Sequence, residues 1–209
     1  MIPVKVLAVR RLTGADPRLC RALGAPEGAK CLGLLTTDCD DATYIALDAA
    51  TKAAKVRVCY GQSFYGGAAN ASTPYAGEVL GILAAETPGA LSSGLDAALS
   101  VLEGIGFESR GEVPYLAYTV SSCGSFLAAE TGVTEGAALA YLIAPPLESM
   151  YAMDLALKAA DVELCKLYTP PSPTNFGGGI LTGTQSACAA ACAAFAEGVR
   201  QVASKPKDI

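Results

Sequence analysis

The carboxylates of a short acidic run at residues 38–41, and that of Glu78, are the side chains best suited to hold a small ligand. Ionised carboxylates accept charge-assisted hydrogen bonds from ammonium groups, so these residues predict a site for a small cation. For Asp40 and Asp41 the competing interpretation is N-capping of the following helix. For Glu78 it is an ordinary exposed glutamate. When the two halves of the chain are aligned, Glu78 falls opposite Gly179, so the second half carries no carboxylate there.

Nucleophilic catalysis has little support, because the chain contains no histidine. Without imidazole, neither a Ser-His-Asp nor a Cys-His arrangement can form. The eight cysteines include no C-x-x-C pair, so the usual zinc patterns are missing. We expect buried, reduced thiols, with no metal and no cofactor. A thiol-dependent cytosolic enzyme that uses Cys39 or Cys123 beside a carboxylate is the runner-up from another functional class.

Composition limits the partners. The net charge of −5 argues against nucleic acid, whose binding needs clustered lysine and arginine. No apolar run reaches the roughly 18 residues that span a bilayer, and residues 1–11 are interrupted by Lys5, unlike a signal peptide. We therefore expect no membrane partner and a cytoplasmic location. Charged residues make up only 17%, against about 25% in typical soluble domains, which favours surface buried between subunits.

The elements that position these side chains occur twice. Residues 46–59 and 152–165 are identical at eight of fourteen positions, with a constant offset of 106. The matches include two aspartate–lysine pairs spaced four apart, Asp48 with Lys52 and Asp154 with Lys158. An offset this long exceeds the roughly 20–50 residues of a solenoid repeat, so it predicts two copies of one compact domain. We expect these domains at 1–108 and 109–209.

Each half alternates strands with helices in the same order. Strands partly joined by hairpin-like loops favour an α/β fold of the α+β kind, with helices flanking a mostly antiparallel sheet. The first half is expected to have strands at 4–10, 31–36, 56–59 and 78–84, and long helices at 43–54 and 89–102. The second half is expected to have strands at 115–121, 138–144, 162–167 and 179–182, and long helices at 149–160 and 185–202.

A long loop at 60–75 distinguishes the first half. Its sixteen residues show no helical or strand periodicity, and such a loop inside a compact domain is usually functional or disordered. Its glycines permit large changes of backbone angle, and its aromatic side chains can pack it shut. The alternative is an ordered loop in a subunit contact. The equivalent loop at 168–179 contains three prolines and is expected to form a fixed rim.

At the repeated helix the chain resembles the bacterial microcompartment (BMC) shell domain. Residues 154–162 fit that family's Asp-x-x-x-Lys-x-Ala-x-Val pattern, and residues 48–56 fit it as well. The tandem layout and the segments 40–46 and 144–148 resemble the family's ethanolamine-utilisation branch. The resemblance implies circularly permuted domains and a homotrimer of six domains that tiles with other shell proteins into a shell in the cytoplasm. It implies a structural protein rather than an enzyme.

The resemblance also implies roles for particular residues. Lys52 and Lys158 match the lysine that lies along the tile edge, although a lysine on such a helix is more simply a solvated one. The 60–75 loop would gate a central pore, through a set that comprises Phe64, Tyr65, Gly66, Gly67 and Asn70.

A ligand follows from the same resemblance. Asp40, Asp41 and Glu78 would hold the ammonium of ethanolamine, with Phe107 and Asn175 lining the same narrow channel. Cobalamin, which serves the lyase inside such shells, is a conceivable partner to which no residue here points. A ligand-binding regulatory module that never tiles is the remaining alternative, and imaging of sheets would separate it from a tile.

Overall fold

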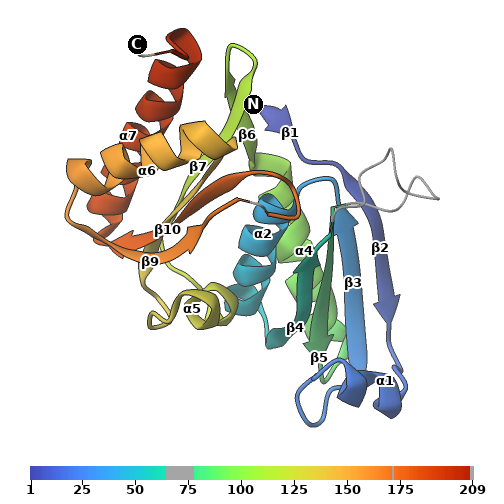
Figure 1. The fold of residues 1–209 in the computed structure, drawn as a ribbon. Coiled ribbons are helices and arrows are strands. Elements are labelled where there is room, and N and C mark those ends of the chain that lie inside the picture. Colours follow the sequence, from blue (N-terminus) through green and yellow to red (C-terminus); the bar gives the residue numbers. More distant parts are fainter. Residues whose placement is uncertain (65–77, 171, 208–209) are drawn as a thin grey trace. The chain divides into compact units, whose positions relative to one another are not determined.

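The structure is a computed structural model that describes residues 1–64, 78–170 and 172–207 (Figure 1). It divides into two compact units, which are described separately. The N-terminal unit comprises Pro3–Ile105 and Gly124–Leu127, and the C-terminal unit comprises Met1–Ile2, Gly106–Cys123 and Ala128–Ile209. A short segment from the second half of the sequence thus belongs to the first unit. The division of the repeat at 108/109 stays a prediction.

The N-terminal unit is built on an antiparallel sheet with the strand order β2-β3-β5-β4. Helices α2 and α4 pack on one face. The short helix α1 lies on the other, where Cys20 packs with Leu32 and Ile82. The strands are β2 (Val6–Leu12), β3 (Cys31–Thr37), β4 (Val56–Ser63) and β5 (Val79–Ala85), and the helices are α1 (Pro17–Ala22), α2 (Asp40–Ala53) and α4 (Pro88–Gly104).

Two glycines let the helices approach this sheet closely. A Cβ atom on Gly33 would lie 2.9 Å from side-chain atoms of both Leu91 and Leu95, and one on Gly81 would lie 2.7 Å from Leu47. Because neighbouring strand residues point to opposite faces, these glycines place α2 and α4 on the face away from α1. The three leucines are fully buried, so the core of this unit lies between the sheet and the two long helices.

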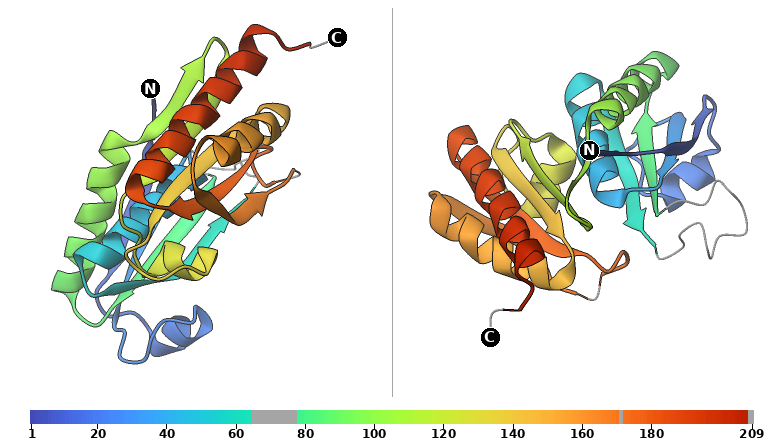
Figure 2. Two further views of the ribbon diagram at one scale, coloured as in Figure 1. Left: turned by 90° about the vertical axis from the view of Figure 1, so that its left-hand side faces the viewer. Right: turned by 90° about the horizontal axis from the view of Figure 1, so that it is seen from above.

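The C-terminal unit has a sheet with the strand order β1-β6-β7-β8-β10-β9. Helices α6 and α7 lie side by side on one face (Figure 2), where Leu142, Met153 and Phe195 are buried together. The close contact of the two helices depends on Gly198, since a Cβ there would lie 2.8 Å from the Cα of Ala152. The strands are β1 (Ile2–Pro3), β6 (Gly106–Arg110), β7 (Val113–Val120), β8 (Ala138–Ala144), β9 (Val162–Tyr168) and β10 (Gly177–Gly183), and the long helices are α6 (Pro146–Ala159) and α7 (Gln185–Ser204). The short helix α5 (Ser125–Thr131) begins in the N-terminal unit and ends in this one.

The repeat is visible in backbone conformation as well as in sequence. After α1, Gly24 and Gly28 have φ values of 68° and 86°; after α5, Gly132 and Gly136 have φ values of 74° and 92°. These left-handed conformations favour glycine, so both copies need it at the same two places. The two turns therefore identify α1 and α5 as equivalent elements.

The predicted α/β class with antiparallel sheets and flanking helices is confirmed, while several element boundaries were wrong. Helix α2 begins at Asp40 and α6 at Pro146, each three residues before the expected start. Strand β4 continues to Ser63, so residues 60–63, expected in the loop, pair with β5 instead. Both ends of the expected 168–179 loop likewise belong to strands: Tyr168 ends β9, and Gly177 begins β10.

Within the described ranges, no helix is both long enough and apolar enough to cross a membrane.

Candidate functional site

The acidic run lies where β3 passes into α2. The backbone N–H of Lys5 donates to Asp38 Oδ1 at 2.7 Å, and the N–H of Asp38 donates back to the Lys5 carbonyl at 3.2 Å. Asp40 and Asp41 are both buried and form the first turn of α2. A carboxylate at this end of a helix is favoured by the helix dipole.

The N-capping interpretation of Asp40 and Asp41 was wrong. The N-cap is Cys39, whose side chain makes no capping hydrogen bond, and Asp40 Oδ1 accepts instead from the N–H of Asp41 at 2.9 Å. Thr43, expected to begin the helix, lies inside it. Its hydroxyl contacts the Thr37 hydroxyl at 2.7 Å and donates to the Cys39 carbonyl at 2.8 Å. The two aspartates therefore belong to the helix whose start they were expected to cap.

Glu78 ties together the ends of three strands. Its N–H donates to the Thr37 carbonyl at 2.9 Å, and its carbonyl accepts from the N–H of Phe64 at 2.9 Å. Burial raises the pKa of the Glu78 carboxyl, and the nearby charges of Asp40 and Asp38 raise it further. Several like charges thus converge at this end of the N-terminal unit, an arrangement that a cation would stabilise.

The strand registers correct the expected counterpart of Glu78. Val79 pairs with Thr37, the last residue of β3, and Gly177 pairs with Ala144, the last residue of β8. Glu78 therefore corresponds to Phe176 and not to Gly179. The carboxylate remains a feature of the first half alone.

The thiol of Cys39 is unsuited to nucleophilic chemistry. Burial raises its pKa well above the usual thiol range, and the charge of Asp41 adds to the effect. Cys123 is also buried, and its thiol donates to the Thr134 carbonyl at 3.5 Å. Among the described residues, no group of three His, Cys, Asp or Glu side chains is arranged to hold a metal ion.

The two remaining predicted channel residues, Phe107 and Asn175, belong to the C-terminal unit. Phe107 contacts the ring of Phe176, and Asn175 precedes Phe176 in the chain. The rings of Phe107 and Phe176 meet edge to face, with centroids 5.5 Å apart. Asn175 has a left-handed backbone, with φ of 61°, and its N–H donates to the Ser172 carbonyl at 3.2 Å. The structure thus groups Asp40, Asp41 and Glu78 in one unit and Phe107 and Asn175 in the other. The single channel that joins them stays a prediction.

Of the predicted gate, the structure describes only the first residue. Phe64 follows β4 and is 38% exposed. Tyr65, Gly66, Gly67 and Asn70 lie outside the described residues. The strand end beside Phe64 holds a contact that the sequence did not suggest, between the hydroxyls of Tyr44 and Ser63. Burial raises the pKa of Tyr44 to about 12, so this hydroxyl stays neutral at cellular pH.

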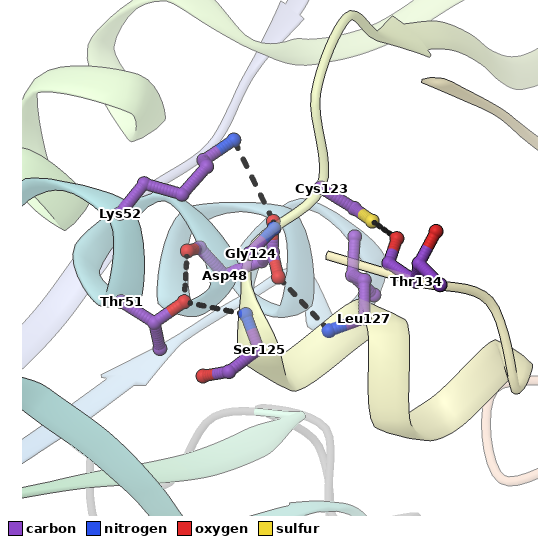
Figure 3. A network of polar contacts seen from close by, with 8 residues as sticks. All are labelled: Asp48, Thr51, Lys52, Cys123, Gly124, Ser125, Leu127 and Thr134. Carbon is purple, nitrogen blue, oxygen red and sulfur yellow. Dashed lines mark hydrogen bonds and ion pairs between the residues drawn. The ribbon is translucent and has the colours of Figure 1, made fainter. Parts of the chain in front are cut away.

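The first of the two predicted edge lysines sits beside a buried carboxylate. Lys52 Nζ lies 3.6 Å from Asp48 Oδ2, and the Asp48 side chain is only 1% exposed (Figure 3). The same carboxylate accepts from the N–H of Gly124 at 2.7 Å and from the N–H of Leu127 at 2.9 Å. Asp48 therefore caps the start of α5, a helix from the second half of the sequence.

Thr51 completes this network one turn along α2. Its hydroxyl donates to the Asp48 carbonyl at 2.7 Å and accepts from the N–H of Ser125 at 3.1 Å (Figure 3). A Cβ atom on Gly124 would lie 2.2 Å from this hydroxyl oxygen, so any larger residue there would force the segment to shift. The aspartate in the repeat was noted from sequence, but its partners, more than 70 residues away, gave no signal.

The second predicted edge lysine has an open environment. Lys158 Nζ lies 2.6 Å from Asp154 Oδ2, and the two side chains are 70% and 57% exposed. This is a solvated ion pair within one helix, which contributes little to stability.

Known proteins with similar sequences cover almost the whole chain. No protein-family model matches the chain. It is 54% identical over 210 residues to the bacterial microcompartment shell protein EutL of Clostridium perfringens (strain 13 / Type A). The matched region covers 99% of this chain and 97% of that relative. It is 44% identical to EutL of Escherichia coli (strain K12), over 99% of this chain and 96% of that relative.

Solved structures agree with this relationship. The ethanolamine utilization protein EutL from Leptotrichia buccalis C-1013-b superimposes with a TM-score of 0.95 at 53% identity, over 100% of this chain and 98% of that chain. PduB, described as a trimeric bacterial microcompartment shell protein, shares the fold at 20% identity with a TM-score of 0.78, over 96% of this chain and 89% of that chain.

These relationships decide among the functional classes. The relatives are shell proteins and not enzymes, so the thiol-dependent enzyme and the non-tiling regulatory module lose their support. The same relationships place the protein in the shell of a bacterial microcompartment, which resides in the cytoplasm. The chain belongs to the EutL family of bacterial microcompartment shell proteins and is a structural component of an ethanolamine-utilisation shell.

Proposed function

We propose that three copies of the chain close into a ring of six domains, a tile with a central pore through which metabolites cross the shell. Two domains in each chain, divided at about 108/109, would supply the six sectors. The repeated turns after α1 and α5 support this equivalence of the halves. PduB, which has the same fold and is described as trimeric, also supports it.

The proposed pore gate comprises Phe64, Tyr65, Gly66, Gly67 and Asn70. The hydrogen bond from the Phe64 N–H to the Glu78 carbonyl holds the two ends of the 64–78 segment together at the end of the sheet. A change of conformation between those fixed ends would therefore leave the sheet intact. A ligand bound at Glu78 would act directly on the base of the gate.

The ligand we propose is ethanolamine, held through its ammonium by Asp40, Asp41 and Glu78. The observation that carries this proposal is the placement of Glu78 beside the end of β3, where α2 begins with the buried Asp40 and Asp41. Burial and the charges of Asp40 and Asp38 raise the pKa of Glu78, in keeping with this convergence of carboxylates. An ammonium group among these carboxylates would reduce their mutual repulsion and donate charge-assisted hydrogen bonds to them. These interactions would offset the cost of removing the charges from water. Phe107 and Asn175 would line the approach. No residue in the part of the chain that the structure describes indicates that cobalamin binds.

Isothermal titration calorimetry with ethanolamine tests the site. We expect the double variant Asp40→Asn, Glu78→Gln to bind at least about tenfold more weakly, since it loses two charge-assisted hydrogen bonds. Glu86→Gln, which changes an exposed glutamate beyond β5, should bind as the unaltered protein does. Ethylene glycol, which lacks the ammonium, should not bind. Equal affinities for the double variant and the unaltered protein would remove the site from the proposal.

A further inference from the structure

Two cysteines of the N-terminal unit lie in one apolar cluster, although they come from elements far apart in the sequence. Cys20 of α1 is buried and packs with Leu32 and Ile82 on the sheet face that α1 covers, and Cys59 of β4 packs against the same cluster. The Cys59 thiol donates to the Ile82 carbonyl at 3.5 Å. Both cysteines are free thiols in this structure. Ile82 is therefore a neighbour that the two thiols share.

The backbone of β4 presents Cys59 to the sheet face that α1 covers. Val56 of the same strand lies on the opposite face, since a Cβ atom on Gly94 of α4 would lie 2.9 Å from it. Successive strand residues alternate between faces, so Cys59, three residues later, points toward α1. The register of β4 with β5 shifts between Val58 and Tyr60, which makes Cys59 the unpaired residue of a bulge. Its position can therefore adjust without loss of a strand pairing.

Helix α1 leaves Cys20 similarly free to adjust. The structure describes all of Pro17–Ala22, and Cys20 is the one buried residue among these six. A small rotation of α1 would therefore move the Cys20 sulfur while it disturbed few other packed side chains. The two thiols thus share a neighbour, and neither is held by a rigid element.

We infer that Cys20 and Cys59 form a reversible disulfide, a redox switch that ties α1 to β4. The oxidant is a low-molecular-weight disulfide such as oxidised glutathione. Cys59, the more exposed of the two, attacks it as a thiolate, forms a mixed disulfide and releases one glutathione thiolate. The Cys20 thiolate then attacks the Cys59 sulfur and releases the second. The two protein thiols lose two electrons and two protons, and the small disulfide becomes two thiols.

The surroundings of the two thiols favour the disulfide once it has formed. Burial raises the pKa of Cys59, and the nearby Cys20 raises it further. A thiol with a raised pKa is poorly stabilised as its thiolate, so its environment does little to favour the reduced state. The same shift keeps the thiolate fraction small at neutral pH. Exchange with glutathione is therefore expected to be slow and to accelerate as the pH rises.

The bond would close a ring of chain between residues 20 and 59 that contains β3 and α2. Such a ring restricts the unfolded chain, so the oxidised protein should melt about 5 °C or more above the reduced protein. Disulfides of cytoplasmic proteins are usually transient or redox-sensing, which suits a bond that glutathione can both make and break. The switch depends neither on the proposed pore nor on the proposed ligand.

The test follows the thiols of the full-length protein in glutathione mixtures of increasing oxidised fraction. Each sample is quenched with acid and alkylated, and its intact mass is measured. Before alkylation we expect a species about 2 Da lighter than the reduced protein, since two thiol hydrogens are lost. Proteolytic peptides should contain the link between Cys20 and Cys59. Cys165→Ser, which changes the equivalent of Cys59 in the second half, is the matched control and should keep this link.

Single variants separate a disulfide from simple proximity of two thiols. Cys20→Ser should retain glutathione on Cys59 as a mixed disulfide, because the thiol that displaces it is gone. Cys59→Ser should form neither species. Circular dichroism under reducing conditions checks that each variant is folded.

The unaltered protein decides the outcome even where a variant does not fold. Persistent glutathione on Cys59, a link from either cysteine to a different one, or unchanged thiols in the most oxidised mixture would each overturn the inference. An oxidised protein that melts no higher than the reduced one would contradict the stabilising ring.

Discussion

The aspartate–lysine pair at 48 and 52 and its copy at 154 and 158 occupy the same positions of the same repeated helix. In the first, the carboxylate is buried and its oxygens accept two backbone N–H groups from the start of α5. In the second, both side chains are exposed and bond to each other. The repeat preserved the residues while their surroundings diverged, because a segment covers one helix face and leaves its equivalent open. Identity of sequence between two halves therefore does not imply identity of role.

The largest difference between the two pairs is expected when each carboxylate is removed in turn. Asp48→Ala is expected to lower the free energy of unfolding by about 3–5 kcal/mol, since two buried N–H groups lose their acceptor and the ion pair with Lys52 is removed. Asp154→Ala should change it by no more than about 0.5 kcal/mol, as for other exposed pairs. Urea denaturation followed by circular dichroism measures both. Similar losses for the two variants would mean that the burial of Asp48 does not decide its role.

Gly124, whose N–H donates to Asp48, allows the same contact to be tested from the α5 side. Gly124→Ala places a Cβ against the Thr51 hydroxyl and the Asp48 carbonyl, so the segment must shift. We expect a loss of about 1–3 kcal/mol, typical of an overpacked site. Gly14→Ala is the matched control, because a Cβ there has no neighbour within 4 Å. The melting temperature should fall for the first variant only, and an unchanged value would contradict the close contact.

The two lysines test whether the pairs share a role in the assembled shell despite their different surroundings. We expect Lys52→Ala, Lys158→Ala to leave a folded trimer that forms sheets poorly in electron micrographs. The effect on the stability of a single chain should be about 1 kcal/mol or less for either change, since both ammonium groups are partly exposed. Arginine at both positions keeps the charge and provides the control. Normal sheets from the double alanine variant would remove the edge role.

The smallest expected effect extends the comparison to Glu78 and its counterpart Phe176. The folded pKa of Glu78 is raised above the ordinary value, so the folded chain holds this proton more tightly than the unfolded chain does. Its contribution to stability is therefore complete below the ordinary glutamate pKa and is lost as the pH rises through the raised one. Glu78→Gln should flatten this part of the dependence of unfolding free energy on pH, measured by urea denaturation at a series of pH values. An identical slope in the variant and the unaltered protein would contradict the raised pKa of Glu78.

The sequence predicted the class of fold because its signals are local and repeated. The aspartate–lysine repeat marks α2 and α6, and the buried strands read as apolar runs. It misplaced the start of α2, because Cys39 is a weak capping residue and Thr43 a strong one. It also paired Glu78 with Gly179, since the loops before β5 and β10 differ in length and only the strand registers show the correspondence.

The site was harder to predict, because its decisive contacts are distant in sequence. Asp48 was recognised as a repeated residue, but its acceptor role depends on the N–H groups of Gly124 and Leu127, which any residues would supply. The convergence of Glu78 with Asp40 and Asp38 depends on β5 lying beside β3. Periodicity reports which face of an element is buried, and it does not report which elements meet.

The placement of Gly124–Leu127 in the N-terminal unit has a consequence for how the protein is made. Synthesis proceeds from the N-terminus, so a ribosome that has released residues 1–105 has not yet released the last part of the first unit. Until α5 emerges, Asp48 lacks the two donors that satisfy it in the finished chain. The earlier half of the protein thus reaches its final form only after the later half has begun to appear, so the N-terminal unit is not a product of the first 105 residues alone.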